Sequence, residues 1–367
     1  MAARRALAEN CVVSVHLGYA AGDFHTLLDG DPYLPEESWH NDRVRCRAAG
    51  IPDDVVYRPK WQMALTQYRR AVGNGVRFAW LTFDEGYGGK PPFLRELDAC
   101  GQNYVGEIPV SFVGWTVPPE ILHRQLSRDK RMGRPRKFPR LKVRHTPACE
   151  VRDLLKYSPI VRRIPWVAYR VKDGQKGPMV WEAKCVPFWI KDQRGLPIGP
   201  HHLLICRSAL DPTEVKFFLC NAPTDTPVTT TLLLVAFDRW RIERMFEDSK
   251  GELGLDHFEV RRYGSLCRHL LLTCVSHLFL AEYRQCKKND AELTVRQVWT
   301  ATRKLAHLWY RGGRCSRNRA ESIAAQLAIT QKRNAKARRS HRKRTIQRLQ
   351  SRGFRLSDLV RCQWPKE

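Results

Sequence analysis

Asp84 is the first candidate for a catalytic or ligand-binding residue, because of its side chain and its position in the sequence. Residues 76–83 predict a buried strand, and Asp84 follows at its carboxyl end. Sheets of the α/β class present catalytic or ligand-binding side chains there, because the strand fixes the backbone and the next loop leaves an open crevice. A structural alternative is equally plain: an Asp two residues before Gly86 also suits a turn or a helix cap.

The second candidate is a group of charged residues in a predicted helix. Arg239, Glu243, Phe246 and Lys250 are spaced by four, three and four residues, so they share one face of an α-helix. The pattern sets a carboxylate between two cations. It also describes an ordinary ion-pair stripe on a solvated helix face. Spacing alone does not separate the two interpretations.

Hydrophobic patterning indicates which elements would position these residues. The amino-terminal segments read as a hairpin at 11–28, helices at 36–49 and 61–72, a strand at 76–83, a helix at 91–100 and a strand at 103–110. A strand, a helix and a strand with short connections predict an α/β layer with parallel pairing. Residues 164–223 predict an antiparallel β region, and residues 229–253 and 266–286 predict long helices.

The charge of the chain narrows the class of partner. The 367 residues include 64 Lys and Arg against 37 Asp and Glu, a formal net charge of +27. With 43% hydrophobic residues the chain can bury a core, which excludes a disordered polycation. A strongly basic folded protein points to a polyanionic partner, nucleic acid first and an anionic membrane surface second.

Sequence signals for membrane insertion, secretion and metal-binding cysteines are weak. No stretch reaches the ~18 uninterrupted apolar residues of a spanning helix, and the best candidate, 269–281, is too short. The first ten residues lack the apolar core of a signal peptide, so we expect a cytoplasmic protein. The twelve cysteines form no C-x-x-C pair and are expected to be free thiols.

Two basic segments could contact DNA. Arg134 and Arg136 belong to GRPRK at 133–137, which resembles the core of an AT-hook, whose extended Arg-Pro backbone lies in the A/T minor groove. Generic phosphate binding is the alternative for this short match. Residues 331–355 carry eleven Lys and Arg and no acid, and they predict a cationic helix that contacts the DNA backbone.

The combination of these segments resembles the DDE insertion-sequence transposases. The match is to the cut-and-paste branch whose signature helix reads Tyr-x2-Arg-x3-Glu-x6-Lys and follows a large β insertion; Arg239, Glu243 and Lys250 match in register. TFDEGYG at 82–88 resembles the second-Asp strand of the family, and LGLDHFEVR at 253–261 resembles the segment after its signature helix. The similarity covers roughly residues 10–290.

The resemblance implies an α/β fold with a ribonuclease-H-like catalytic core, an antiparallel β insertion and a basic helical carboxyl-terminal tail. The implied domains are 1–115 for the first part of the core, 116–163 for a basic linker, 164–228 for the insertion, 229–290 for the second part of the core with the signature helix, and 291–367 for the tail.

The resemblance also implies a DNA transposase that uses two divalent ions for phosphodiester hydrolysis and strand transfer. Asp84 and Glu243 would ligate Mg²⁺, with Mn²⁺ as a substitute. Arg239 and Lys250 would hold DNA phosphates near the scissile bond. The implied partner is double-stranded DNA at the terminal inverted repeats of the element, bound by a homodimer at the nucleoid and not at a membrane.

Two positions depart from the family pattern. The signature Tyr falls on Ala236. The family places its first catalytic Asp on an opening strand before the hairpin, yet the ten residues before Cys11 hold no Asp, and Asp23, Asp29 and Asp31 match nothing in the motif. We therefore expect a chain that lacks its opening strand and whose activity is severely reduced. A non-catalytic DNA-binding remnant is the alternative, and a metal-dependent ribonuclease of the same fold fits the carboxylates but not the insertion.

Overall fold

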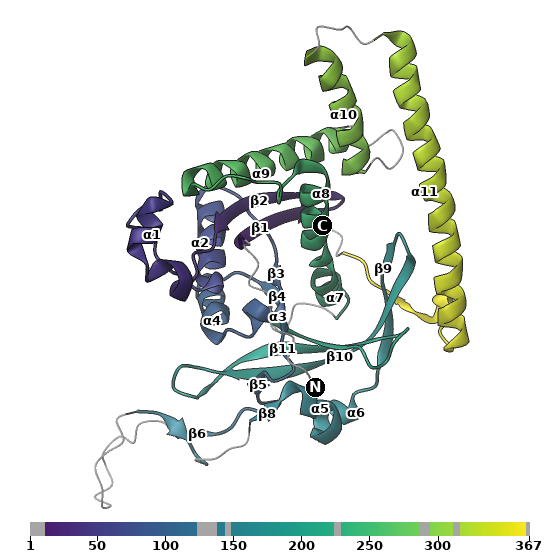
Figure 1. Ribbon diagram of the computed structural model, residues 1–367. Helices are drawn as coiled ribbons and strands as arrows, with labels where there is room; N and C mark the ends of the chain where they lie inside the picture. The colour runs from purple at the N-terminus through teal and green to yellow at the C-terminus, as the bar shows by residue number, and fades with distance from the viewer. Residues whose placement is uncertain are drawn as a thin grey trace, which may run out of the picture. The chain divides into compact units, whose positions relative to one another are not determined.

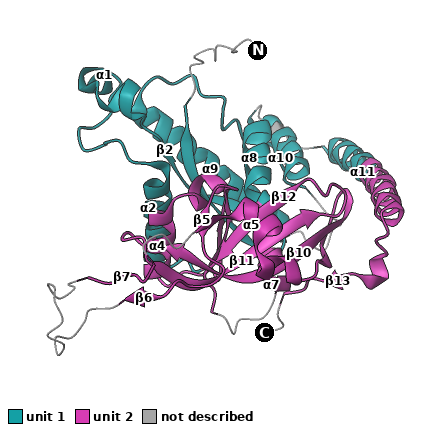
Figure 2. Cartoon of the chain, turned by 90° about the horizontal axis from the view of Figure 1, so that it is seen from below, with its two compact units in different colours: residues 1–77, 240–331 teal, residues 78–239, 332–367 magenta. Residues whose placement is uncertain are grey.

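A computed structural model describes residues 12–122, 138–143, 148–223, 229–286, 294–310 and 316–364 (Figure 1). The chain has a mixed α/β fold that divides into two compact units (Figure 2). Unit 1 contains Met1–Arg77 and Trp240–Gln331, and unit 2 contains Phe78–Arg239 and Lys332–Glu367. Each unit is therefore assembled from two stretches of chain that lie far apart in the sequence.

Unit 1 is a hairpin covered by helices. Its elements are β1 (Ser14–Ala21), β2 (Phe24–Pro32), a π-helical turn (Glu36–His40), α1 (Arg43–Ala48), α2 (Lys60–Gly73), α8 (Trp240–Leu253), α9 (Tyr263–Cys286), α10 (Val295–Tyr310) and the first part of α11 (Arg317–Ser351). β1 and β2 pair antiparallel, which confirms the predicted hairpin. The buried Gln67 of α2 ties the helix to this hairpin, because its side-chain nitrogen donates to the Val15 carbonyl at 2.8 Å.

Unit 2 is built on a seven-stranded sheet. Its first elements are β3 (Leu81–Phe83), α3 (Glu85–Gly88), α4 (Pro91–Ala99), β4 (Tyr104–Ile108), β5 (Val113–Gly114), β6 (Ile121–Leu122), β7 (Arg140–Leu141), β8 (Cys149–Glu150), α5 (Val151–Tyr157) and α6 (Pro159–Arg163). They are followed by β9 (Val167–Gly174), β10 (Gly177–Lys191), β11 (Pro197–Ser208), β12 (Val215–Cys220), α7 (Thr229–Asp238), the rest of α11, a 3₁₀ turn (Leu356–Asp358) and β13 (Val360–Arg361).

The sheet of unit 2 is mixed, with the strand order β13-β9-β10-β11-β12-β4-β3. β3 and β4 pair in parallel around α4, as the strand–helix–strand pattern predicts. β9 to β12 pair antiparallel with their chain neighbours, and β12 pairs antiparallel with β4. The antiparallel strands thus continue the same sheet that begins with the strand leading to Asp84.

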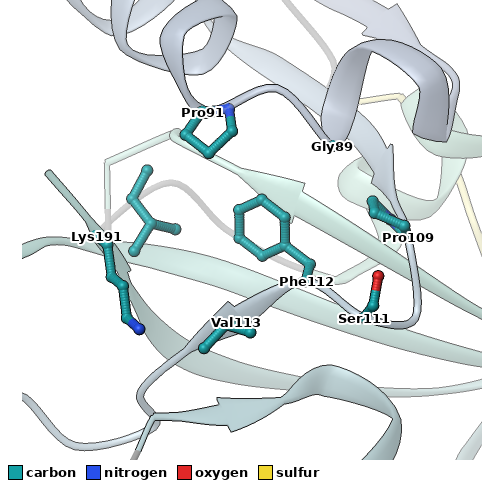
Figure 3. A pocket seen from close by; sticks show the side chains of 8 residues that line it. Gly89, Pro91, Pro109, Ser111, Phe112, Val113 and Lys191 are labelled. Carbon is teal, nitrogen blue, oxygen red and sulfur yellow. The ribbon is translucent and has the colours of Figure 1, made fainter. Parts of the chain in front are cut away.

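A pocket of about 260 Å³ opens in unit 2 beside the loop that follows α3 (Figure 3). Apolar side chains dominate its lining, including Pro91, Pro109 and Phe112. Of the eight described residues around it, Lys191 alone is charged. The pocket therefore offers no carboxylate or histidine for chemistry.

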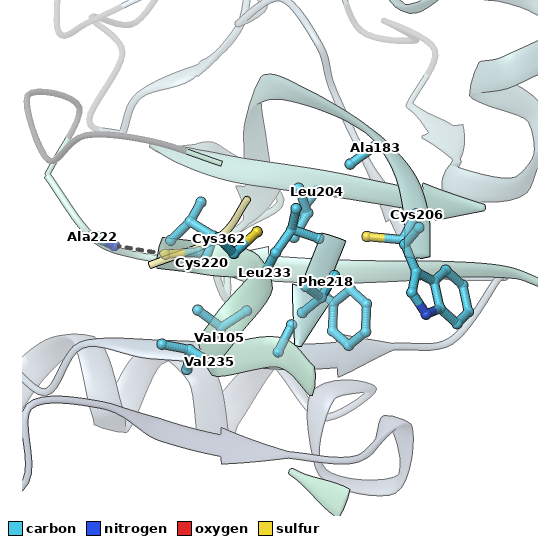
Figure 4. Packing of buried hydrophobic residues seen from close by; sticks show 14 residues of the cluster. Val105, Ala183, Leu204, Cys206, Phe218, Cys220, Ala222, Leu233, Val235 and Cys362 are labelled. Atoms are coloured by element: carbon cyan, nitrogen blue, oxygen red, sulfur yellow. Dashed lines mark hydrogen bonds between the residues drawn. The ribbon is translucent and has the colours of Figure 1, made fainter. Parts of the chain in front are cut away.

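A core cluster of unit 2 lies where α7 covers one face of the sheet (Figure 4). Leu233 of α7 packs there with Leu204 of β11 and Phe218 of β12, all fully or almost fully buried. Burying each such side chain contributes about 1.5–3 kcal/mol. α7 is apolar over most of its circumference, as expected of a helix with so little exposed surface.

The long helix predicted over 229–253 is interrupted at Arg239, so the prediction of one continuous helix is wrong there. α7 ends at Asp238 and α8 begins at Trp240. The Lys172 ammonium of β9 donates to the Phe237 carbonyl, which in a continuous helix would accept from the N–H of residue 241. A cation at the end of α7 also interacts favourably with the helix dipole.

Gly106 allows β4 to pack against Phe83 of β3. A Cβ at Gly106 would lie 1.9 Å from the Phe83 ring, which itself packs 5.0 Å from the Phe93 ring. We expect Gly106→Ala to lower the free energy of unfolding by about 3 kcal/mol, because the ring must leave its site. Urea denaturation measures this loss. Gly251→Ala is the control, since its Cβ meets nothing within 4 Å and alanine favours a helix.

The cysteines that the structure describes are all free, which confirms that prediction for this part of the chain. Cys46, Cys206, Cys220, Cys274 and Cys362 are buried. Burial raises the pKa of Cys220 to about 12, so its thiol stays protonated and unreactive at neutral pH.

α9 is longer and more apolar than the sequence count suggested. With 24 residues, it is the one described helix that is long and apolar enough to cross a membrane, by length and composition only. The count of uninterrupted apolar residues stopped at isolated polar side chains, although the helix as a whole is apolar. About 33% of its most apolar 18 residues are buried inside the fold.

Candidate active site

Asp84 lies at the carboxyl end of β3 and begins α3. Its Oδ1 accepts a hydrogen bond from the Gly86 N–H at 2.9 Å, so Asp84 is the N-cap of α3 and the structural alternative is realised. The cap uses one carboxylate oxygen, and the residue is exposed. Burial and the charge of Asp84 raise the pKa of the neighbouring Tyr87 to about 12. The carboxylate is therefore both a helix cap and an accessible negative charge.

The position of Asp84 depends on close packing of α3 against β4. A Cβ at Gly88 would lie 1.9 Å from the Glu107 carbonyl oxygen, so only glycine fits at this contact. Asp84 thus lies between β3, which pairs with β4, and α3, which packs closely against β4.

Arg239 belongs to an ion-pair group on β4 and β12 of unit 2. Its Nε lies 3.6 Å from Oε2 of Glu107, whose Oε1 accepts from Lys216 Nζ at 2.9 Å. The Glu107 and Arg239 side chains are largely buried, at 15% and 21% exposure. Arg239 therefore lies outside α8 and has a structural partner in unit 2.

Glu243 and Lys250 lie on α8 in unit 1. They are seven residues apart, which is two helical turns, and both are exposed. Met245 on the other side of α8 packs in the core with Leu27 and Cys274. The helix therefore buries its apolar face against the hairpin and α9 while Glu243 and Lys250 face solvent.

Lys250 lies near Phe246 of α8, at the point where this helix contacts β1. Its Nζ is 6.0 Å from the centroid of the Phe246 ring, which in turn packs edge-on against His16 at 5.3 Å. Burial lowers the pKa of His16, and the positive charge of Lys250 lowers it further. A cation at this point is suited to an anionic ligand.

Asp29 and Asp31 of β2, which match no motif in the sequence, form a structural group. Arg70 of α2 donates to Oδ2 of each carboxylate at 2.6 Å. Gln67 donates a further hydrogen bond to Asp31 at 2.9 Å. Both acids are thus engaged in holding α2 to the hairpin.

Arg134 and Arg136 lie outside the described residues. The candidate acids lie in separate units, Asp84 in unit 2 and Glu243 in unit 1. Within the described part of the chain, no three His, Cys, Asp or Glu side chains form a group that could hold a metal ion. Asp84 and Glu243 are nevertheless exposed residues with carboxylate groups, whose oxygens are the donors that Mg²⁺ prefers.

Unit 1 contains a pair of buried histidines that the sequence patterns did not predict. His25 and His277 lie with ring centroids 6.3 Å apart, and each has a buried Nε2 without a hydrogen-bond partner. Burial, together with the positive charge of the nearby Arg284, lowers the pKa of each to about 4. The two histidines are 252 positions apart, so no local spacing could have linked them.

Comparison with protein families bears on the segment that carries Asp84. Residues 4–178 match the DDE superfamily endonuclease family. The match covers a little under half of the chain and supports a DDE-type transposase or endonuclease. A comparison with curated proteins gave no match.

The DDE match includes Asp84 but ends before Arg239, Glu243 and Lys250. The seven-stranded mixed sheet with its surrounding helices is consistent with the ribonuclease-H-like fold of DDE enzymes. A DDE endonuclease domain implies DNA as the substrate, and enzymes of this superfamily generally use divalent metal ions.

Proposed function

We propose that this protein is a DNA transposase that hydrolyses phosphodiester bonds at the ends of an insertion sequence and transfers the released strands. The observation that carries the proposal is the exposed Asp84 at the carboxyl end of β3, inside the segment that matches the DDE endonucleases. The substrate would be the terminal inverted repeats of the element, bound in the cytoplasm at the nucleoid.

In this proposal Asp84 and Glu243 hold the divalent ions, Mg²⁺ or Mn²⁺. When bound, such ions activate the attacking oxygen and stabilise the leaving oxygen. Both carboxylates are exposed, and Asp84 keeps one oxygen outside its cap interaction with Gly86. The rigid strand and helix beneath Asp84 would orient it without rearrangement.

Lys250, Arg239 and the GRPRK residues Arg134 and Arg136 would contact DNA phosphates. Lys250 is exposed on the same face of α8 as Glu243, so a phosphate beside one is within reach of the other. Arg239 lies 3.6 Å from the Glu107 carboxylate. To contact a phosphate, Arg239 would have to leave Glu107 or bind both groups at once.

The second half of α11 would supply further contacts to the DNA backbone. Its anchored face docks on the β9–β10 turn, where Thr345 Oγ1 donates to the Lys176 carbonyl at 2.6 Å and Leu349 is fully buried. Its exposed cations are Lys332, Arg333, Lys336, Arg339, Arg342, Lys343, Arg344 and Arg348, of which Arg342 also pairs with Asp173 at 3.3 Å. A helix fixed on one face and cationic on the other suits sequence-independent phosphate contact.

The test is cleavage of a labelled duplex that carries the inverted repeats flanking the gene, with Mg²⁺, with Mn²⁺ and with EDTA. Slow, metal-dependent nicking at the repeat ends is the expected result. A duplex of scrambled sequence is the substrate control. Cleavage that persists in EDTA would contradict the proposed metal chemistry.

A second candidate function is a DNA-binding protein without catalysis. The capping bond of Asp84 to Gly86 favours it, because the residue has a structural role that needs no metal. Salt-sensitive binding to the duplex without nicking under any metal condition would support this candidate and exclude the first.

A further inference from the structure

α9 has one face buried in unit 1 and the opposite face exposed. The buried face carries Thr273, Cys274, His277 and Leu280, and it packs along β2 and against α10 (Figure 1). The exposed face carries Leu271, Leu272, Val275, Leu278 and Phe279. Leu271, Leu272 and Phe279 are 63%, 65% and 56% exposed, respectively. A contiguous apolar stripe of this kind marks an interaction surface.

The exposed stripe has an internal symmetry about Val275. Leu271 and Phe279 lie four residues on either side of it, and Leu272 and Leu278 lie three residues on either side. At about 100° per residue, all five side chains fall within roughly 60° of the direction of Val275. The same stripe read from either end therefore presents apolar residues at the same positions.

Opposite charges flank the stripe in the same symmetric way. Arg268 lies seven residues before Val275 and Glu282 lies seven residues after it, and both are exposed. Seven residues are nearly two full turns, so both charges lie on the face of Val275. The stripe thus begins with a cation and ends with an anion.

We propose that this face of α9 binds the same face of a second copy of the chain, antiparallel, with a two-fold axis at Val275. In this arrangement Leu271 faces Phe279 of the partner subunit and Arg268 faces Glu282 of the partner subunit. An isologous interface needs such self-complementarity. A parallel pair would set Arg268 against Arg268 and Glu282 against Glu282, which like charges oppose.

A lipid bilayer fits the face less well. Arg268 and Glu282 are fourteen residues apart, about 21 Å along the helix, against a hydrocarbon core of about 30 Å. The opposite face of α9 is also engaged in unit 1, where His277 Nδ1 lies 3.2 Å from Thr26 Oγ1. A spanning helix would have to give up these contacts.

The test is the mass of the full chain in solution, measured by sedimentation velocity over a wide range of concentrations after bound nucleic acid has been removed. A dimer is expected. Arg268→Glu and Glu282→Arg should each raise the dimer dissociation constant about tenfold, because each sets two like-charge pairs across the interface. The double variant should restore the wild-type constant, and Val275→Glu should give a monomer.

Cross-linking tests the antiparallel register. Val275→Cys should link two copies of the chain through the introduced thiols with a short bis-maleimide, because the two positions meet at the axis. The native, exposed Cys286 should give no link to its own copy, since the two lie about 33 Å apart along the antiparallel pair.

Three results would overturn the proposal. One is a chain that stays monomeric at every concentration. Another is a dimer unaffected by Val275→Glu or not restored by the double variant. The last is a monomer that sediments with phosphatidylcholine and phosphatidylglycerol vesicles and loses this binding in Val275→Glu, which would assign the face to a bilayer.

Discussion

Asp84→Asn is expected to lower the rate of metal-dependent DNA nicking by at least about a thousandfold without unfolding the protein. Loss of a charged metal ligand removes several kcal/mol of transition-state stabilisation, and each 1.36 kcal/mol is a factor of ten in rate. Asparagine is as good an N-cap as aspartate, so the bond to the Gly86 N–H that begins α3 is retained. The substitution therefore separates the proposed catalytic role from the capping role.

Asp84→Ala and Glu85→Gln complete this experiment. The alanine variant loses the cap as well and should lower the free energy of unfolding by about 1 kcal/mol, which the asparagine variant should not. Glu85 is the neighbouring exposed acid in α3, so Glu85→Gln controls for a general loss of negative charge. Nicking at the wild-type rate in Asp84→Asn would show that Asp84 is a helix cap only.

The same logic applies to Glu243 on α8. We expect Glu243→Gln to abolish nicking to a similar degree, since it would remove the second metal ligand. Glu247→Gln is the matched control, because Glu247 is exposed on the same helix and pairs with Arg244 at 2.9 Å. Equal losses in both variants would mean that α8 needs its acids for stability rather than for chemistry.

Unit 1 is expected to lose stability as the pH falls from about 6.5 to 4. Burial lowers the pKa of His25 and His277 to about 4, so the folded protein keeps both rings neutral where the unfolded chain protonates them. The unfolded state then binds more protons, and the free energy of unfolding falls with falling pH. A shift from 6.5 to about 4 corresponds to on the order of 3 kcal/mol for each histidine at the acidic end.

Thermal denaturation between pH 4 and pH 8 measures this effect. His277→Gln should reduce the pH dependence over the acidic half of the range, even if the variant is less stable at neutral pH. His257→Gln is the control, because the His257 side chain is 75% exposed. An unchanged pH dependence in His277→Gln would contradict a neutral, buried role for this ring. The positive charge of Arg284 lowers the pKa of both histidines, and those of Arg241 and Arg244 lower the pKa of His25, in the same direction as burial.

Local pattern was enough to predict many of the elements. The hairpin of β1 and β2, the helix α2 and the parallel pair β3–β4 follow the patterns in their own segments. Each depends on the periodicity and turn residues of a short stretch, which is information that neighbouring residues carry. The position of Asp84, after a strand and two residues before Gly86, could likewise be predicted from neighbouring residues.

The positions of the charged residues proposed for the site depend on tertiary contacts that the spacing of residues in the sequence cannot predict. Arg239 was predicted on the same helix face as Glu243, yet Lys172 takes the Phe237 carbonyl and the helix ends before it. Lys172 and Phe237 are 65 residues apart, and their meeting depends on how β9 packs beside α7. Sequence periodicity cannot anticipate a side chain that arrives from another element.

By itself, the sequence determined that a strand ends directly before Asp84, the excess of positive charge and the free state of the described cysteines, because these are properties of composition and of neighbouring residues. The strand itself is shorter than predicted, at Leu81–Phe83 instead of 76–83. Only the tertiary structure decided that Asp29 and Asp31 are held by Arg70, that His25 and His277 share a buried site, and that one face of α9 stays exposed. The physical reason is common to all three. Burial and pairing depend on which distant segments pack together, and that is settled by the folded chain as a whole.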